Sequence, residues 1–221
     1  MFEVYKTKNQ KPETRNQKPE TNKQFFMFEY LNHLDTQLFL FLNGLHNSFF
    51  DPIMYWLSDK DIWLPFYLLI AFLIIRHYKR DSILIIIVAI VTLAICDQAA
   101  SHLIKLIVER LRPSHEPLLN GLVHLSKAGA GGQFGFVSSH TANAIGMAVF
   151  FGLTLDKSFR ILKYVLFIWA ILVSYSRIYN GVHYPGDVLG GALLGSGISY
   201  LMFKLYLILK IKFSKNKYLS E

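Results

Sequence analysis

Segment 82–108 is the feature that most constrains this chain, because it is apolar for longer than a bilayer is thick. Its only charged residues are Asp97 and Lys105, and a spanning helix needs about 20 mostly apolar residues. The whole chain is 52% hydrophobic and 17% charged, against about 25% charged in an ordinary soluble domain. This composition excludes a disordered chain, a collagen-like fibre and a disulfide-stapled miniprotein. We therefore expect an integral-membrane protein.

The hydrophobic pattern predicts an all-α, integral-membrane helical bundle with five spans. They are expected at residues 62–75, 82–108, 141–155, 161–175 and 188–209. Residues 28–57 mix apolar and polar side chains, which predicts an N-terminal helix that either lies in the interface or forms a sixth span. Between the second and third spans, residues 109–139 form a long glycine-containing loop, expected to act as a flexible lid.

Three regions are predicted along the chain. Residues 1–26 are polar, carry a direct repeat (9–14 copied at 16–21) and are expected to be disordered. Residues 27–210 form the membrane-embedded domain, and residues 211–221 form a basic cytoplasmic tail. Met27 is a second candidate start of the chain.

The formal net charge of +8 comes mostly from the flanks of apolar segments. Six of the 23 Lys and Arg residues lie in the first 24 positions, and five lie at or beyond Lys204. The connections 76–80 and 156–163 carry three each. Because basic residues mark the cytoplasmic side of a membrane protein, the opposite face is expected to be periplasmic, in a bacterial inner membrane. No basic groove with interleaved aromatic residues is present, which argues against nucleic-acid binding.

The opposite face holds three polar clusters, each at the end of a predicted span. In the first, Lys105 and Arg112 are seven residues apart, two helical turns, so both can project from one side. The alternative is snorkelling of basic side chains at the membrane interface. In the second, Ser138, Ser139 and His140 open the third span, where free N–H groups suit a phosphate. Capping of the helix explains the serines equally well, but not the histidine.

The third cluster bridges the fourth and fifth spans and holds Arg177, His183 and Asp187. Asp187 follows His183 by four residues, so its carboxylate can hold one ring nitrogen and raise the basicity of the other. Alternation of the helices brings all three clusters to one membrane face. Cations and N–H groups would neutralise a phosphoryl group there, while one histidine attacks and the other protonates the leaving oxygen.

The motifs Lys-x6-Arg-Pro, Ser-x-His and Ser-Arg-x5-His-x3-Asp resemble those of the type 2 phosphatidic acid phosphatase superfamily, in its bacterial integral-membrane branch, over residues 28–209. The resemblance implies a lipid phosphatase that uses no metal or other cofactor and usually has six spans. The resemblance implies that the phosphate is bound by Lys105, Arg112, Ser138, the Ser139 backbone and Arg177. It implies that His183 is the nucleophile and His140 the general acid. Asp187 would orient His183, and Ser176 would have a lesser structural role. The chain departs from the family at Ser139, where glycine is usual, which would tighten the phosphate pocket or add a hydroxyl.

The resemblance also implies a lipid phosphate or diphosphate as the substrate partner. Undecaprenyl diphosphate is expected first and lipid A next, with phosphatidic acid and phosphatidylglycerol phosphate also open; the sequence predicts no oligomeric state. A non-catalytic transporter or lipid-binding protein is the alternative of another class. The pair His183 and Asp187 argues against it, because binding an anion needs cations but no nucleophile.

Several other polar or small residues need no catalytic explanation. Gly190, Gly191, Gly195 and Gly197 fit close packing of the fifth span against another helix. Asp97 fits either support of Lys105 or a polar contact inside the bundle. Five of the histidines outside the motifs lack ligand-like spacing with one another, so no metal site is predicted: His33, His46, His77, His115 and His124. Cys96 is the only cysteine, which excludes an internal disulfide.

Overall fold

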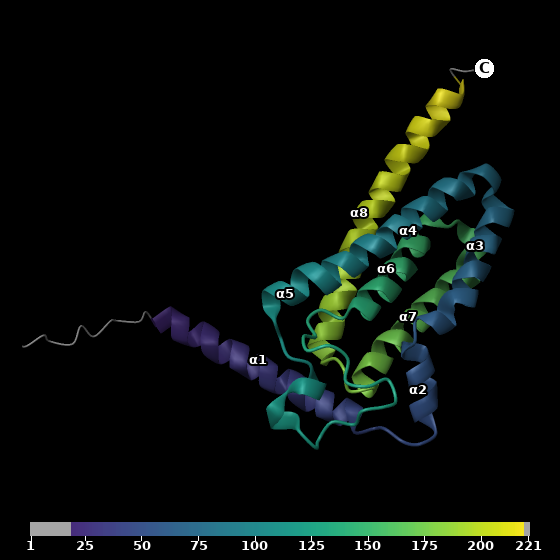
Figure 1. Ribbon diagram of the computed structural model, residues 1–221. Coiled ribbons are helices and arrows are strands. Elements are labelled where there is room, and N and C mark those ends of the chain that lie inside the picture. The colour runs from purple at the N-terminus through teal and green to yellow at the C-terminus, as the bar shows by residue number, and fades with distance from the viewer. Residues whose placement is uncertain (1–18, 219–221) are drawn as a thin grey trace, which may run out of the picture. The chain divides into compact units, whose positions relative to one another are not determined.

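The computed structural model describes residues 19–218. In this range the regular secondary structure is helical, and the only β-type pairing is an isolated antiparallel bridge between Leu111 and Phe134. The longer helices are α1 (Pro19–Asn43), α2 (Phe50–Ser58), α3 (Leu64–Tyr78), α4 (Ser82–Gln98), α6 (Ser139–Thr154), α7 (Arg160–Tyr179) and α8 (Pro185–Tyr218) (Figure 1). Two units are distinct, Met1–Leu34 and Asp35–Glu221. The second unit holds α2 to α8, so the all-helical fold class is confirmed for the described residues.

Each of the five predicted spans is a helix. Three helical stretches of the described chain are long and apolar enough to cross a membrane: Asp61–Val108, Lys157–Tyr179 and Pro185–Phe213. The first of them contains both α3 and α4, which are joined through a short turn at Lys79–Asp81. Whether five or six segments span the membrane stays a prediction.

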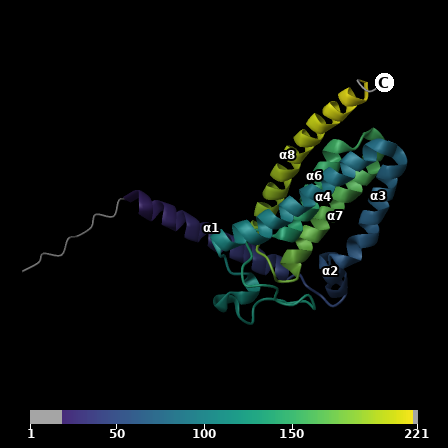
Figure 2. The same cartoon turned by 45° about the horizontal axis from the view of Figure 1, so that its top comes forward.

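The helix α6 forms the centre of the second unit, with contacts to α4, α7 and α8 (Figures 1 and 2). Glycines on α8 allow the backbones of α6 and α8 to lie close together. A Cβ atom on Gly195 would lie 2.2 Å from the Ala142 carbonyl oxygen, and one on Gly191 would lie 2.5 Å from that of Ser138. Small residues allow helix backbones to pack this closely. The predicted packing role is confirmed for Gly191 and Gly195, but a Cβ on Gly197 would meet nothing within 4 Å.

The two basic connections predicted to share a membrane face do meet. His77 at the end of α3 pairs with Asp156 after α6, with Nε2 and Oδ2 2.7 Å apart. The Tyr78 hydroxyl accepts a hydrogen bond from the Asp156 backbone N–H, and the Tyr78 ring stacks on Phe159. The loop that follows α5 lies at the other end of the bundle, where α6 and α8 begin (Figure 1).

The chain ends are more helical than the sequence suggests. Helix α1 begins at Pro19, inside the region 1–26 for which disorder is expected, and residues 1–18 lie outside the described residues. Proline suits this first helical position because its fixed φ is already helical. At the other end, α8 continues to Tyr218, through most of the predicted tail 211–221. The expected helix 28–57 is interrupted at residues 44–49, between α1 and α2.

The predicted span 82–108 is helical but not regular. After α4 the chain takes a wider π-helical turn, η3 (Ala99–Ile104), and then a last turn, α5 (Lys105–Val108). Glu109 stops the helix in the left-handed conformation, with φ 47°. Single π turns often accompany functional sites, and this one immediately precedes Lys105.

We expect Gly195→Ala to destabilise the protein and Gly197→Ala to leave it unchanged or slightly more stable. The added methyl group at residue 195 collides with the α6 backbone, and overpacking of this kind costs about 1–3 kcal/mol. At residue 197 the methyl group enters open space, and alanine favours the helix by about 0.5–1 kcal/mol. Thermal unfolding midpoints of both variants in detergent provide the measurement. Equal midpoints would contradict close packing of α6 on α8.

Candidate active site

The three predicted clusters converge at one end of the second unit. His140 lies in the first turn of α6, Arg177 in the last turn of α7, and Asp187 in the first turn of α8. His183 lies in the short connection between α7 and α8, and Arg112 follows α5. The structure therefore gathers the side chains that the sequence places far apart.

The His183 imidazole is held between a cation and a carboxylate. It is 1% exposed, its Nε2 lies 3.3 Å from Arg112 Nη1, and its Nδ1 lies 3.4 Å from Asp187 Oδ2. The second distance exceeds that of a good hydrogen bond. Burial lowers the pKa of His183 well below its ordinary value, and the charges of Arg112, Arg177 and Lys105 act in the same direction. This lowered pKa favours the neutral imidazole, which has a lone pair on one nitrogen.

Three cations around His183 lack a carboxylate partner among residues 19–218. They are Lys105, Arg112 and Arg177, and the two arginines are each 8% exposed. Arg112 donates from Nε to the Phe134 carbonyl oxygen at 3.1 Å, whereas Arg177 Nε is buried with no hydrogen-bond partner. Buried charges are normally paired. This surplus of positive charge suits a doubly negative oxyanion such as phosphate.

The start of α6 shows the capping role, one of the two alternatives that the sequence left open. Ser138 is the N-cap, and its hydroxyl accepts hydrogen bonds from the N–H and the hydroxyl of Thr141. Ser139 and His140 follow in the first turn, half-buried, next to the free N–H groups of the helix. Burial lowers the pKa of His140 to about 2, and the charges of Arg177, Lys105 and Arg112 act in the same direction. A phosphate bound at this helix end stays a prediction, and its contact with Ser138 would add to the capping role.

Arg110 is a residue whose importance the sequence analysis missed. Its Nη1 donates to Asp187 Oδ1 at 2.9 Å, and its Nη2 donates to Asp35 Oδ2 at 2.7 Å. Asp35 also accepts the N–H of Gly186, and the Arg110 guanidinium lies over the Tyr184 ring. The positive charge of Arg110 is thus neutralised by two carboxylates. Only the position of Arg110, two residues before Arg112, could have suggested this role.

The loop 109–138 is built into the site, unlike the flexible lid that the sequence predicts. Its two sides are tied by backbone hydrogen bonds, from Arg112 N–H to Gln133 and from Gly135 N–H to Arg110. A Cβ on Gly135 would lie 3.0 Å from Asp187 Oδ2, and one on Gly131 would lie 2.9 Å from Arg112 Nη1. Glycine lets the backbone approach the two charged side chains, and at Gly131 it also suits the left-handed φ of 69°.

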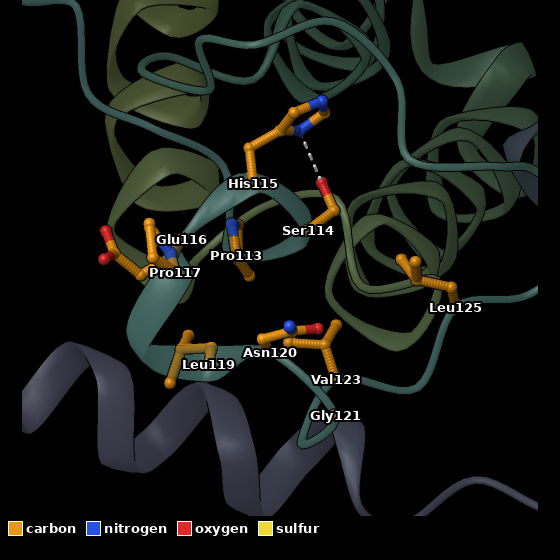
Figure 3. Close-up of a pocket in the computed structure, with 10 residues that line it drawn as sticks. All are labelled: Pro113, Ser114, His115, Glu116, Pro117, Leu119, Asn120, Gly121, Val123 and Leu125. Atoms are coloured by element: carbon orange, nitrogen blue, oxygen red, sulfur yellow. Dashed lines mark hydrogen bonds between the residues drawn. The ribbon is translucent and has the colours of Figure 1, made fainter.

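The same loop encloses a hollow of about 240 Å³ that none of the predicted site residues lines (Figure 3). Its walls come from residues 113–125, and Ser114 and His115 are hydrogen-bonded to each other beside it. Asp97, the other candidate outside the motifs, accepts a hydrogen bond from Asn143 Nδ2 at 3.1 Å. This contact joins α4 to α6 and agrees with the bundle-contact alternative.

A second polar cluster, also missed from the sequence, anchors the loop to α7. Asp51 accepts from the Tyr179 hydroxyl at 2.8 Å and lies 3.0 Å from His124 Nε2. The His124 ring stacks on His46, with centroids 3.8 Å apart. Hydrogen bonds from Tyr179 and His124 lower the pKa of Asp51 against the opposing effect of its desolvation. Asn43 completes the anchor by donating to the carbonyl oxygens of His124, Ile178 and Tyr179.

Comparison with known proteins identifies the family and several relatives of this chain. The model of the PAP2 superfamily matches residues 82–210. Lipid A 4'-phosphatase of Bacteroides thetaiotaomicron is 38% identical over 80% of this chain and 79% of its own, and that of Porphyromonas gingivalis is 35% identical over 81% and 75%. A transmembrane PAP2-type phosphatidylglycerolphosphate phosphatase from Bacillus subtilis shares the fold, with a TM-score of 0.57, 24% identity, and 88% of this chain and 96% of its own covered.

We expect Gly135→Ala to weaken binding of inorganic phosphate about tenfold or more, whereas the matched loop variant Gly132→Ala binds as the wild type does. A methyl group at residue 135 pushes on Asp187 and Arg112, but a Cβ at residue 132 meets nothing within 4 Å. A misplaced charge-assisted hydrogen bond is worth about 1.5–3 kcal/mol. Titration calorimetry of the detergent-purified variants measures the affinity. Equal affinities would show that the loop does not shape the site.

Proposed function

The chain belongs to the PAP2 superfamily, and from this premise we propose that it is a metal-independent membrane lipid phosphatase acting through a phospho-histidine intermediate. One observation carries the proposal. A buried neutral imidazole, His183, lies between Arg112 and Asp187, with a second histidine, His140, in the same positively charged site. A binding protein or a transporter needs the cations but not this pair of histidines.

In the proposed site, the cations receive the phosphate before any bond breaks. Lys105, Arg112 and Arg177 bind its non-bridging oxygens, and the Arg177 Nε–H gains the partner that it lacks. The N–H groups at the start of α6 add further donors. The bound dianion offsets the surrounding positive charge, which allows His140 to hold the proton that it must deliver.

The chemistry then proceeds in two transfers. The lone pair of His183 Nε2 attacks phosphorus, the bond to the leaving oxygen breaks, and His140 gives that oxygen its proton. Asp187 faces Nδ1–H and stabilises the charge that develops on the ring. In the second transfer, His140 accepts a proton from water, the water oxygen attacks phosphorus, and the P–N bond breaks to release phosphate and neutral His183.

Lipid A is the substrate that we propose, with the undecaprenyl diphosphate expected first from the sequence as the competitor. The similarity to two lipid A 4'-phosphatases, each over at least 80% of this chain, supports this order. We place the protein in a bacterial inner membrane with the site facing the periplasm. The basic connections that meet at His77 and Asp156, at the other end of the bundle, support this orientation.

The first test is phosphate release by the detergent-purified protein, in EDTA, from lipid A, undecaprenyl diphosphate, phosphatidic acid and phosphatidylglycerol phosphate. We expect lipid A to be preferred and His183→Ala to abolish release, because the nucleophile is lost. His140→Ala should reduce kcat by about 10²–10⁴, the usual contribution of a general acid. The exposed His115→Ala is the matched control and should keep wild-type activity. Release that EDTA stops, or that His183→Ala retains, would contradict the proposed mechanism.

The pH dependence provides an independent test of His183. Because its pKa is well below the ordinary value of about 6.5, the acid limb of kcat/KM from His183 should lie below that pH. Arg112→Gln removes a positive neighbour, which raises the pKa of His183 and moves this limb to higher pH. The substrate phosphate titrates equally in both proteins, so the difference isolates the imidazole. A limb that stays in place or moves to lower pH would contradict the assignment.

A further inference from the structure

A cavity of about 390 Å³ adjoins the site on the side of His140. Ser139, His140 and two further residues of α6 form part of its wall, and the rest comes from α2, α3, α4, η3, α7 and the segment 60–63. In the proposed reaction, His140 protonates the leaving oxygen, so the leaving group must lie on this side of phosphorus. The volume falls within the range of small-molecule pockets, about 300–1,000 Å³.

Three residues of the cavity wall carry buried polar atoms without a hydrogen-bond partner. They are Ser58 Oγ, Asn143 Oδ1 and Trp169 Nε1. Ser58 is 5% exposed and Trp169 is 6% exposed. A buried polar group left unsatisfied costs about 1–3 kcal/mol, and a buried tryptophan N–H normally finds an acceptor. Three such atoms around one cavity favour a polar occupant.

The chemistry of the three atoms defines that occupant. Trp169 Nε1 can only donate, and Ser58 Oγ can do both. The Asn143 amide is oriented by the bond from its Nδ2 to Asp97, which leaves Oδ1 as an acceptor. An occupant that satisfies all three must therefore both accept and donate hydrogen bonds. Hydroxyl groups have this property, whereas a hydrocarbon chain would leave every one of these atoms unpaired.

Three aromatic residues form much of the remaining wall, which also holds Asp97, Ser101 and several aliphatic residues. Trp63, Tyr67 and Trp169 all line the cavity, with ring centroids 5.4 Å apart for Trp63 and Trp169 and 5.8 Å apart for Tyr67 and Trp169. Lys60 lies at the exposed part of the lining. Flat apolar surfaces beside isolated polar atoms suit a compact ring that carries hydroxyl groups at its edge. The Ser139 hydroxyl, which replaces the usual glycine, adds one more polar group to this wall.

We infer that this cavity receives the sugar ring that carries the phosphate of a glycolipid substrate, and that Ser58, Asn143 and Trp169 select such a leaving group over a polyprenyl or glycerol one. The inference rests on the proposed function, because it takes the leaving group to be the one that His140 protonates. It adds to that function a specificity pocket formed by residues outside the three motifs.

The test compares two phosphate monoesters, lipid A and phosphatidic acid, in detergent. Ser58→Ala and Trp169→Phe should each lower kcat/KM for lipid A about tenfold, the value of one hydrogen bond. Both variants should hydrolyse phosphatidic acid within about twofold of the wild-type rate. The exposed residues Ser48 and Trp56 provide matched controls as Ser48→Ala and Trp56→Phe, which should change neither substrate. Equal losses on the two substrates, or no loss on lipid A, would overturn the inference.

A binding measurement separates failure of this inference from failure of the proposed function. The His183→Ala variant cannot hydrolyse its substrate by the proposed route. The binding of lipid A and of phosphatidic acid to this variant can therefore be measured at equilibrium. Adding Ser58→Ala should weaken lipid A binding about tenfold and leave phosphatidic acid binding unchanged. This result would support the sugar pocket even if the wild-type protein released no phosphate. Unchanged lipid A binding would overturn the pocket even if the wild-type protein proved to be an active phosphatase.

Discussion

The buried carboxylate of Asp187 is the interaction on which the site depends. Its side chain is 0% exposed, so its charge must be compensated inside the protein. Oδ1 accepts from Arg110, Oδ2 accepts from the Tyr184 N–H and faces His183, and the Asp187 backbone carbonyl oxygen accepts the Ser138 N–H. One residue thereby fixes the loop after α5, the connection before α8 and the start of α6. Asp187 thereby helps to place both histidines, through its contact with His183 and its hydrogen bond to the start of α6.

This arrangement requires the backbones to be close, which explains where the small residues are. The start of α8 reaches that of α6 because Gly191 and Gly195 leave room for the carbonyl oxygens of Ser138 and Ala142. The loop reaches the same carboxylate because Gly135 has no side chain. Helix packing and chemistry are therefore coupled, since any bulk that separates α6 from α8 also moves His140 away from His183.

Much of the fold and the site follows from the sequence, because apolar length and motif spacing are local properties. The five helices lie at the predicted places, and all eight predicted site residues belong to one end of the bundle. What could not be predicted depends on long-range contacts. Asp35 and Arg110 are 75 positions apart, and nothing in the sequence pairs them. The stack of His46 on His124 and the cavity beside His140 likewise arise only when separate helices meet. The π-helical turn at Ala99–Ile104 could not be predicted either, because the apolar pattern around it is uniform.

The cations of the site differ in whether they already have carboxylate partners. Arg110 is already matched by Asp35 and Asp187, so it attracts no further anion and serves as a fixed part of the scaffold. Lys105, Arg112 and Arg177 lack such partners in the described chain, and the proposed binding of an oxyanion would relieve their mutual repulsion. An apolar or cationic molecule would gain nothing from this imbalance. In the proposed function these three cations select for phosphate, while the choice among phosphorylated lipids is made by the pocket proposed on the leaving-group side.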